Sequence, residues 1–154
     1  MKMRNLFDLA RSEDAQSLVE LALLTPLFLL LLFGVVDFGQ AFYVANEIAG
    51  AAHAGAIYGS QNPNDTSGIE TAARDGAPDV TNLSVGTPTY GCECANGTGY
   101  SVNCSITPTC LGGLNVVYRV NLTVTDTYTP IVPFPGIPSS ISLSSSASMR
   151  SAGS

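Results

Sequence analysis

Residues 16–36, with the sequence QSLVELALLTPLFLLLLFGVV, are apolar enough to cross a lipid bilayer. As a helix, the stretch from Leu18 to Val36 covers about 28 Å, close to the roughly 30 Å of the hydrocarbon core. It contains one carboxylate, Glu20, and a charged side chain deep in such a helix costs roughly 2.5–3.5 kcal/mol. The sequence therefore predicts a membrane-spanning helix in which Glu20 has a functional role and a partner.

Basic residues flank this helix on one side only. Lys2, Arg4 and Arg11 precede it, and no Lys or Arg follows until Arg74. Because basic residues favour the cytoplasmic side, we expect the N-terminus in the cytoplasm and the chain after Asp37 outside. The alternative is a cleaved secretory signal peptide, but the apolar core is longer than the usual ~7–15 residues and lacks an Ala-x-Ala exit.

The composition argues against nucleic acid and against catalysis. The formal net charge is −6 and the chain has one Lys, so no basic patch is available for nucleic acid or an anionic membrane surface. The sequence offers one histidine, His53, with no Ser/His/acid set, no phosphate-binding glycine loop and no clustered carboxylates. We therefore predict no enzymatic activity and no cofactor. His53 is interpreted as a helix-face residue that contacts the domain or a neighbour.

Four cysteines, Cys92, Cys94, Cys104 and Cys110, lie close together after the apolar stretch. An even set in an exported segment predicts two disulfides. A zinc site is the competing interpretation, but the C-x-C spacing is not that of the usual zinc knuckle, and we predict no metal. A bridge between Cys92 and Cys94 would be strained. Two pairings remain open: Cys94–Cys104 within Cys92–Cys110, or Cys92–Cys104 with Cys94–Cys110.

The helical pattern continues beyond the apolar stretch. Residues 37–59 repeat apolar side chains at helical spacing, which predicts one helix over residues 16–59 with an amphipathic second half. Small residues, such as Gly55 and Gly59, let another backbone approach closely. They could serve helix pairing or pack under the chain's own sheet. Pro26 removes a backbone hydrogen bond inside the span, so a kink or an unwound turn is expected there unless Thr25 and other neighbouring groups accommodate it.

The rest of the chain predicts a short helix and a small antiparallel sheet. Ser67 and Glu70 have the spacing of a capping box, and Gly76 with Pro78 would end that helix. Apolar and polar residues alternate over 115–128, which predicts a half-buried strand, and weaker patterns suggest strands at 83–90 and 141–149. The loop 129–138 carries four prolines that forbid regular pairing. The fold class is therefore α+β, with the sheet laid on the outer half of the long helix.

After a short basic leader, the sequence AQSLVELALLTPLFLLLLFGVVDFGQAFYVANEIAGAAHAGA resembles the opening segment of the TadE-like minor pilins of the tight-adherence (Tad) pilus system. The resemblance is specific over residues 15–59, about a third of the chain. In that family a prepilin peptidase cuts on the cytoplasmic side, five residues before a glutamate. Carried over, the cut falls between Ala15 and Gln16, with Glu20 as the fifth residue of the mature chain. Pro26 matches the proline typical of the family after that glutamate. Ala15 stands where Gly is commonest.

The resemblance also covers smaller features of the chain. Gly34, Asp37 and Gly39 match a Gly-acid-x-Gly-like pattern, and the Ser/Ala-rich end with Met149 and Arg150 is similar to the C-terminal part of such proteins. Leu21 stands where Phe is usual. The implied organisation is a cytoplasmic leader (1–15), a transmembrane half-helix (16–36), an amphipathic half-helix (37–59) and an extracytoplasmic domain with a disulfide loop (60–154, loop 92–110).

What the resemblance implies is a pilin-like fold and a structural role in a type IV-like pilus used for adhesion. Its partners would be other pilins, the prepilin peptidase and the inner-membrane assembly platform. The chain would first sit in the bacterial inner membrane and then in the pilus at the cell surface. Two alternatives remain: a principal subunit of its own filament, although major Tad pilins are much shorter, and a permanently anchored periplasmic binding domain.

Cleavage would also provide a partner for the carboxylate of Glu20. The new α-ammonium group of Gln16 is a cation that Glu20 can neutralise, within one chain at i, i+4 or between neighbouring subunits. Such a pair would fix the register of neighbouring helices, and we state this as a hypothesis.

Overall fold

The computed structural model describes residues 13–105, 110–132, 136 and 138–151. Contacts between residues divide the chain into two compact units, residues 1–40 and residues 41–154. The expected leader falls mostly outside the described residues, as do its basic residues Lys2, Arg4 and Arg11.

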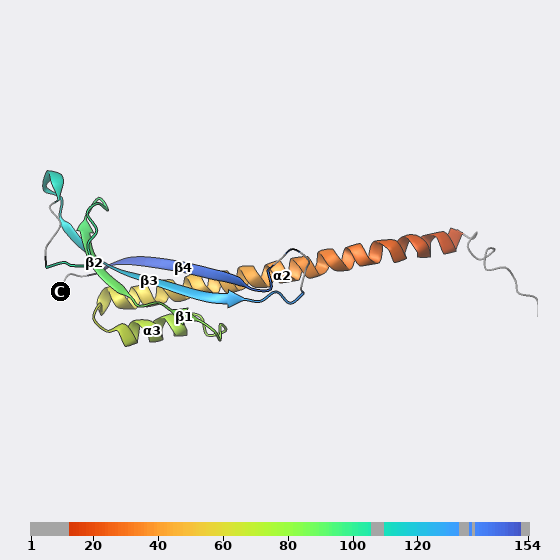
Figure 1. The fold of residues 1–154 in the computed structure, drawn as a ribbon, viewed down its shortest axis with the longest axis horizontal. Helices are drawn as coiled ribbons and strands as arrows, with labels where there is room; N and C mark the ends of the chain where they lie inside the picture. The colour runs from red at the N-terminus through yellow and green to blue at the C-terminus, as the bar shows by residue number, and fades with distance from the viewer. Residues whose placement is uncertain (1–12, 106–109, 133–135, 137, 152–154) are drawn as a thin grey trace, which may run out of the picture. The chain divides into compact units, whose positions relative to one another are not determined.

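Helix α2, Glu13–Gln61, has 49 residues and contributes to both units (Figure 1). It begins three residues before the expected start at Gln16 and ends two residues after Gly59. Gly59 does not end the helix, because it lies on the packed face of α2 against the side chains of Val120 and Ile69. The helix ends just before Pro63, whose preceding residue is restricted away from helical angles.

Four antiparallel strands form one sheet in the second unit. They are β1 (Ser84–Val85), β2 (Thr89–Cys94), β3 (Val116–Tyr128) and β4 (Ile141–Ser151). Strand β3 is central, with β1 and β2 along one edge and β4 along the other. The expected α+β class with a long helix on a small antiparallel sheet is confirmed. The strand expected at 83–90 is instead two strands, β1 and β2.

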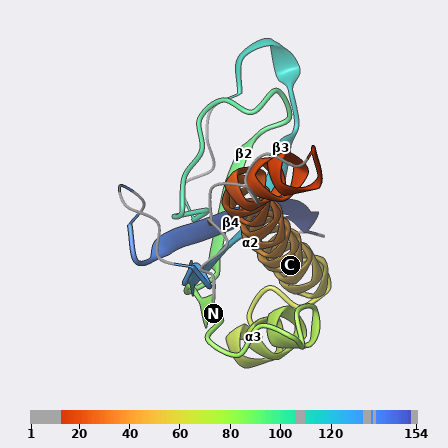
Figure 2. The same ribbon diagram turned by 90° about the vertical axis from the view of Figure 1, so that its right-hand side faces the viewer.

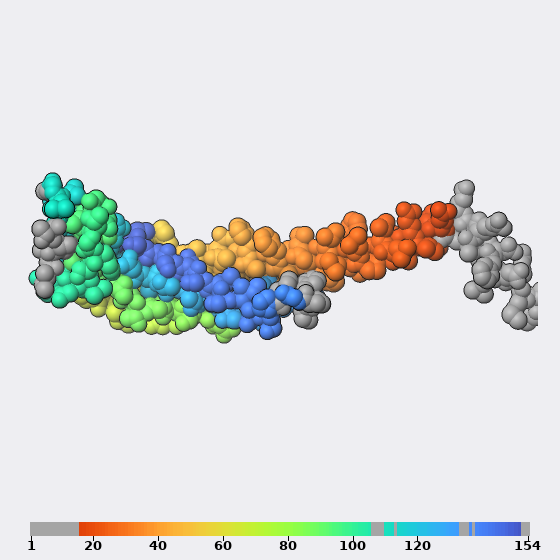
Figure 3. Space-filling model, turned by 45° about the horizontal axis from the view of Figure 1, so that its top comes forward, coloured from red at the N-terminus to blue at the C-terminus, as the bar shows by residue number. Residues whose placement is uncertain are grey.

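The last strand is longer and more regular than its sequence indicates. Pairing between β3 and β4 runs without interruption from Tyr118↔Ser151 to Tyr128↔Ile141. Every residue of β4 is at least partly exposed, and β4, blue in Figure 3, lies on the surface of the second unit. The Ser-rich sequence after Leu143 gives little strand signal by itself. It forms a strand because the edge of β3 supplies a partner for its backbone.

The core lies between one face of the sheet and two helices, α2 and α3 (Thr66–Asp75) (Figure 2). Val120, Leu122 and Val124 alternate along β3 and are fully buried. From the helices, the core takes Ile48, Ala51, Ala52, Ile69 and Ala73. The other face of β3 and β4 is polar.

The small residues of α2 are used within the unit. A Cβ at Gly55 would lie 3.0 Å from the Cβ of Ala73 and 3.1 Å from the carbonyl oxygen of Ile69. A Cβ at Gly59 would lie 2.9 Å from Val120. Of the two uses left open by the sequence, close packing under the chain's own sheet is therefore the one observed for these two glycines.

The expected capping box of α3 is wrong. The N-cap is Asp65, whose carboxylate accepts the backbone N–H of Gly68 at 2.9 Å. Ser67 lies inside the helix and donates its hydroxyl to Asp65, while Glu70 pairs with Arg74 at 2.8 Å. Asp65 prevails because a carboxylate at the N-cap satisfies free N–H groups and faces the positive end of the helix. The helix ends at Asp75 with Gly76 as C-cap, as expected.

Candidate functional site

The first unit presents an apolar helical surface that its own residues do not bury. All the large apolar side chains of α2 between residues 18 and 36 are exposed, by 45% to 74%. They are Leu18, Val19, Leu21, Leu23, Leu24, Leu27, Phe28, Leu29, Leu30, Leu31, Leu32, Phe33, Val35 and Val36. In the described part of the chain, α2 is the one helix long and apolar enough to span a membrane. A surface of this kind requires lipid or other apolar helices around it.

Glu20 interrupts this apolar surface near its beginning. Its side chain is exposed on α2, one helical turn after Gln16. Among the described residues, no hydrogen bond or ion pair to the Glu20 carboxylate is found. The peptide bond between Ala15 and Gln16 lies within α2, which begins at Glu13.

The helix continues through Pro26 without an unwound turn. The neighbouring hydroxyl of Thr25 donates a hydrogen bond of 2.6 Å to the carbonyl oxygen of Leu21. The carbonyl that loses its partner at Pro26 is that of Ala22. Thr25 bonds to Leu21 and not to Ala22, so the expected replacement of the freed bond by Thr25 is not the one observed. Membrane-spanning helices tolerate a proline inside the span better than soluble helices do.

Two disulfides close the segment between β2 and β3. Cys92 is bonded to Cys104 and Cys94 to Cys110, with Cα–Cα distances of 5.6 and 5.5 Å. Two disulfides were expected, and of the two pairings left open, the nested one is not the one observed. Cys92 and Cys94 lie on the same face of β2 and are buried.

A hairpin explains this pairing. Cys92 and Ser101 exchange two backbone hydrogen bonds of 2.8 Å, and the N–H of Cys94 donates to the carbonyl of Thr98. The chain therefore turns back along β2, which brings Cys104 past Ser101 to Cys92 and leaves Cys94 for Cys110. The bridges tie the described parts of this loop to β2, and each contributes roughly 2–4 kcal/mol to stability.

The sequence did not reveal an ion pair on the outer face of the sheet next to this loop. Glu93, which is 7% exposed, bonds to Arg119 on the neighbouring strand. Beside them, the ring of Tyr100 covers Gly91, and the hydroxyl of Tyr100 accepts a 2.9 Å hydrogen bond from Asn121. The only signal in the sequence was that Arg119 and Asn121 occupy the polar positions of β3.

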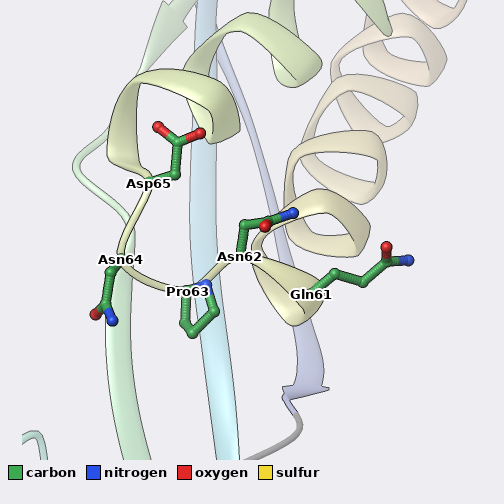
Figure 4. A pocket seen from close by; sticks show the side chains of 5 residues that line it. All are labelled: Gln61, Asn62, Pro63, Asn64 and Asp65. Carbon is green, nitrogen blue, oxygen red and sulfur yellow. The ribbon is translucent and has the colours of Figure 1, made fainter. Parts of the chain in front are cut away.

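A polar hollow at the turn between α2 and α3 is lined by Gln61, Asn62, Pro63, Asn64 and Asp65 (Figure 4). Asp65 is already engaged, because it accepts hydrogen bonds from Gly68, Ser67 and the hydroxyl of Tyr58, the last at 2.8 Å. The hydrogen bond from the Gly68 N–H lowers the pKa of Asp65 most, followed by those from Tyr58 and Ser67. The hydrogen bond to Asp65 raises the pKa of Tyr58. Asp65 therefore connects α2 to the start of α3, and this turn has a structural role.

Two further side chains of α2, those of His53 and Tyr43, are exposed. His53 lies exposed on the helix, away from the core, so the expected contact with the domain is not formed and contact with a neighbour stays a prediction. Tyr43 donates to Asp79 at 2.8 Å, and this bond raises the pKa of Tyr43. Within the described ranges, no three His, Cys, Asp or Glu side chains are arranged to hold a metal ion.

Residues 15–56 match the model of the TadE family, described as TadE-like protein. The match covers α2 from Ala15 to Ala56 and does not extend to the sheet. No curated protein and no solved structure matched the chain. The N-terminal segment is thus TadE-like, as its residues indicated. The match suggests an association with the Tad pilus and with the membrane, and the TadE-like family is structural and not known for enzymatic activity.

Proposed function

We propose that this chain is a minor pilin, or pseudopilin, that takes part in assembling a Tad-type pilus used for adhesion. The observation that carries the proposal is the uncovered apolar surface of residues 18–36, with Glu20 near its start, inside the TadE-like segment. In a monomer this surface suits only lipid. In a filament it suits the apolar helices of neighbouring pilins equally well.

The first step of the proposal is insertion and processing. The chain enters the inner membrane with its N-terminus in the cytoplasm and the residues after Asp37 outside. A prepilin peptidase then cuts between Ala15 and Gln16, which creates an α-ammonium group one helical turn before Glu20.

The second step is assembly. The Glu20 carboxylate neutralises the ammonium group of Gln16, in its own chain or in a neighbouring subunit, where water is scarce and an unpaired charge is costly. The pair therefore favours one helix register over others. Other pilins and the inner-membrane assembly platform are the partners this step requires.

The first experiment identifies the mature chain. Intact mass and N-terminal peptides are measured for protein from envelope fractions and from sheared surface fractions, with and without reductant. We expect a chain that begins at Gln16, occurs in the surface fraction and is four hydrogens lighter before reduction. A chain that begins at Met1 and stays in the membrane would instead support a permanently anchored binding domain. An abundance equal to that of the main pilin would support a principal subunit.

The second experiment tests Glu20. The substitution Glu20→Gln keeps the side-chain shape and removes the charge, so we expect normal membrane insertion and loss of the protein from the pilus fraction. Glu70→Gln is the matched control, because it makes the same chemical change on α3 in the outer unit. Incorporation of the Glu20→Gln chain at the wild-type level would contradict the proposed role of Glu20.

A further inference from the structure

Charge is unevenly divided between the two outer surfaces of the second unit. The helix side carries six carboxylates, those of Glu47, Asp65, Glu70, Asp75, Asp79 and, near the end of β3, Asp126, and one guanidinium, that of Arg74. The outer face of the sheet carries two guanidinium groups, Arg119 and Arg150, and one carboxylate, Glu93. Surfaces of opposite sign on one chain are complementary to each other on neighbouring copies.

Arg119 and Arg150 lie directly opposite each other on β3 and β4. Like charges in this position are unfavourable, and the single carboxylate nearby, Glu93, bonds to Arg119. Arg150 is exposed, and its one described polar contact is a 3.5 Å hydrogen bond to the carbonyl oxygen of Ala95. We call the Arg119–Arg150 pair the cationic sheet end. Its two positive charges face one carboxylate, so a second carboxylate would balance the charge.

Carboxylates that could fill this place lie on the helix side. Glu47 and Asp75 have no hydrogen bond or ion pair to another described residue, whereas Glu70 is bonded to Arg74 and Asp65 caps α3. Gly76 packs on α2 next to Ala51, which places Asp75 near the turn that follows Glu47. Asp79 is held on the same part of α2 by Tyr43. We call Glu47, Asp75 and Asp79 the acidic helix side.

We propose that the cationic sheet end of one copy docks against the acidic helix side of a second copy of this chain. Tyr100 covers Gly91 and bonds to Asn121 at this end of the outer face. Beyond Tyr100 the face suits close approach, because its side chains are short and uncharged. They are Thr123 and Thr125 on β3 and Ser144, Ser146 and Ser148 on β4.

The direction of the elements supports sheet-to-helix contact over strand-to-strand contact. Gly55 and Gly59 of α2 face Leu122 and Val120 of β3, so α2 runs antiparallel to β3 and parallel to β4. Antiparallel pairing of two β4 edges would therefore point the two α2 helices in opposite directions, which two chains anchored in one membrane cannot do. Sheet-to-helix contact keeps all α2 helices in one direction and repeats from copy to copy.

The contact also requires a shift along the helix. The acidic helix side extends from the level of Tyr43, which holds Asp79, to that of Gly50, which approaches Gly76. Arg119 lies next to Val120, opposite Gly59. The helix rises about 24 Å from Tyr43 to Gly59 and about 14 Å from Gly50 to Gly59. A second copy displaced outward by a distance between these two values brings its carboxylates level with the first copy's Arg pair. A staggered contact between copies with parallel α2 helices suits two subunits of one pilus, so this inference rests on the proposed function.

The test uses full-length chains in lipid vesicles and a zero-length carbodiimide, which joins amines to carboxylates in contact. Arg150→Lys keeps the charge and supplies an amine, and equal amounts of isotopically labelled and unlabelled chains distinguish links between copies. We expect mixed-isotope links from position 150 to Glu47, Asp75 or Asp79. The matched control is Ser142→Lys, on the same face at the other end of β4, for which no link to these three carboxylates is expected.

A charge exchange gives a second measurement. Arg150→Glu and Asp75→Arg should each lower energy transfer between labelled full-length chains in vesicles by about fivefold, since each removes an attraction and adds a repulsion. Mixing the two variants should restore pairs, because the altered surfaces then complement each other. Melting temperatures and disulfide content near wild type would show that the variants are folded.

The outcomes separate this inference from the proposed function. Folded Arg150→Lys chains whose introduced amine reacts with a soluble reagent but forms no mixed-isotope link would overturn the docking mode. The chain could then still be processed and found in pili. Links in vesicles from a chain that is absent from pili would support the docking mode and contradict the pilin role.

Discussion

Helix α2 has two regions that are both apolar but differ in the size of their side chains. Between residues 18 and 36 the apolar residues are mostly Leu, Phe and Val, and all of them are exposed. Between residues 48 and 56 the buried residues are Ile48, Ala51, Ala52 and Ala56. Large side chains fill space against lipid or other helices, whereas small ones let a strand and a second helix approach the backbone. Side-chain size thus distinguishes the two environments along one helix.

The largest expected effect tests this difference with one type of substitution. Leu122→Ala removes a fully buried side chain from the core and should lower the free energy of unfolding of the second unit, residues 41–154, by about 2–5 kcal/mol. Leu30→Ala removes an exposed side chain from the first unit and should change that free energy by less than about 0.5 kcal/mol. Urea unfolding of both variants in detergent, followed by tyrosine fluorescence, measures the two values. Equal losses would contradict the division into two units.

Removing a disulfide should have the next largest effect on the free energy of unfolding, confined to the second unit. Replacing Cys92 and Cys104 together by Ser leaves the Cys94–Cys110 bridge and should cost about 2–4 kcal/mol. Replacing Cys92 and Cys110 together removes one partner from each bridge, and this second variant serves to test the pairing. Thiol counting on unreduced protein checks the pairing: two reactive thiols in the second variant are expected, and none there would indicate nested bridges.

Glycines on the two parts of α2 should respond in opposite directions. Gly55→Ala places a methyl group against Ala73 and the backbone of Ile69, so we expect the free energy of unfolding of the second unit to fall by about 1–3 kcal/mol. The methyl group of Gly34→Ala meets nothing within 4 Å. It should leave the stability of the second unit unchanged and favour the helix by about 0.5–1 kcal/mol. Thermal unfolding followed by circular dichroism measures both, and a neutral Gly55→Ala would argue against tight packing of α2 and α3.

The smallest expected effect is the loss of stability at low pH that comes from Asp65. The folded chain holds the pKa of Asp65 below its ordinary value of 3.8, so near and below that pH the unfolded chain binds more protons. The contribution of Asp65 to stability is therefore complete above about pH 3.8 and is lost as the pH falls through the lower, folded-state pKa.

The variant Asp65→Asn separates this effect from capping. Asparagine still accepts the Gly68 N–H but does not titrate, so the variant should show a shallower loss of stability in acid. Urea midpoints between pH 2 and 5 measure it. An unchanged slope would mean that other carboxylates dominate the acid response.

Local patterns in the sequence identified most of the elements. The apolar run before Asp37 and the alternation from Val116 to Tyr128 appear as the long helix and the central strand. Errors arose where a local signal competed with a nearby one, as at Ser67, which has the right spacing for a cap but lies after Asp65. The signal was weak where stability comes from a partner, as in β4. For the candidate site, the sequence supplied Glu20 and the four cysteines, but not the Glu93–Arg119 pair, because its members lie 26 residues apart.

Residue type and spacing alone show that one helix is apolar enough for a membrane, that an acid interrupts it, and that four cysteines lie close together after it. These properties need no distant partner. The pairing of the cysteines, the use of Gly55 and Gly59 in the chain's own core, and the position of Arg119 opposite Arg150 are seen only in the folded unit. Each of these depends on the register between segments far apart in the chain, and that register is set by packing of the whole unit.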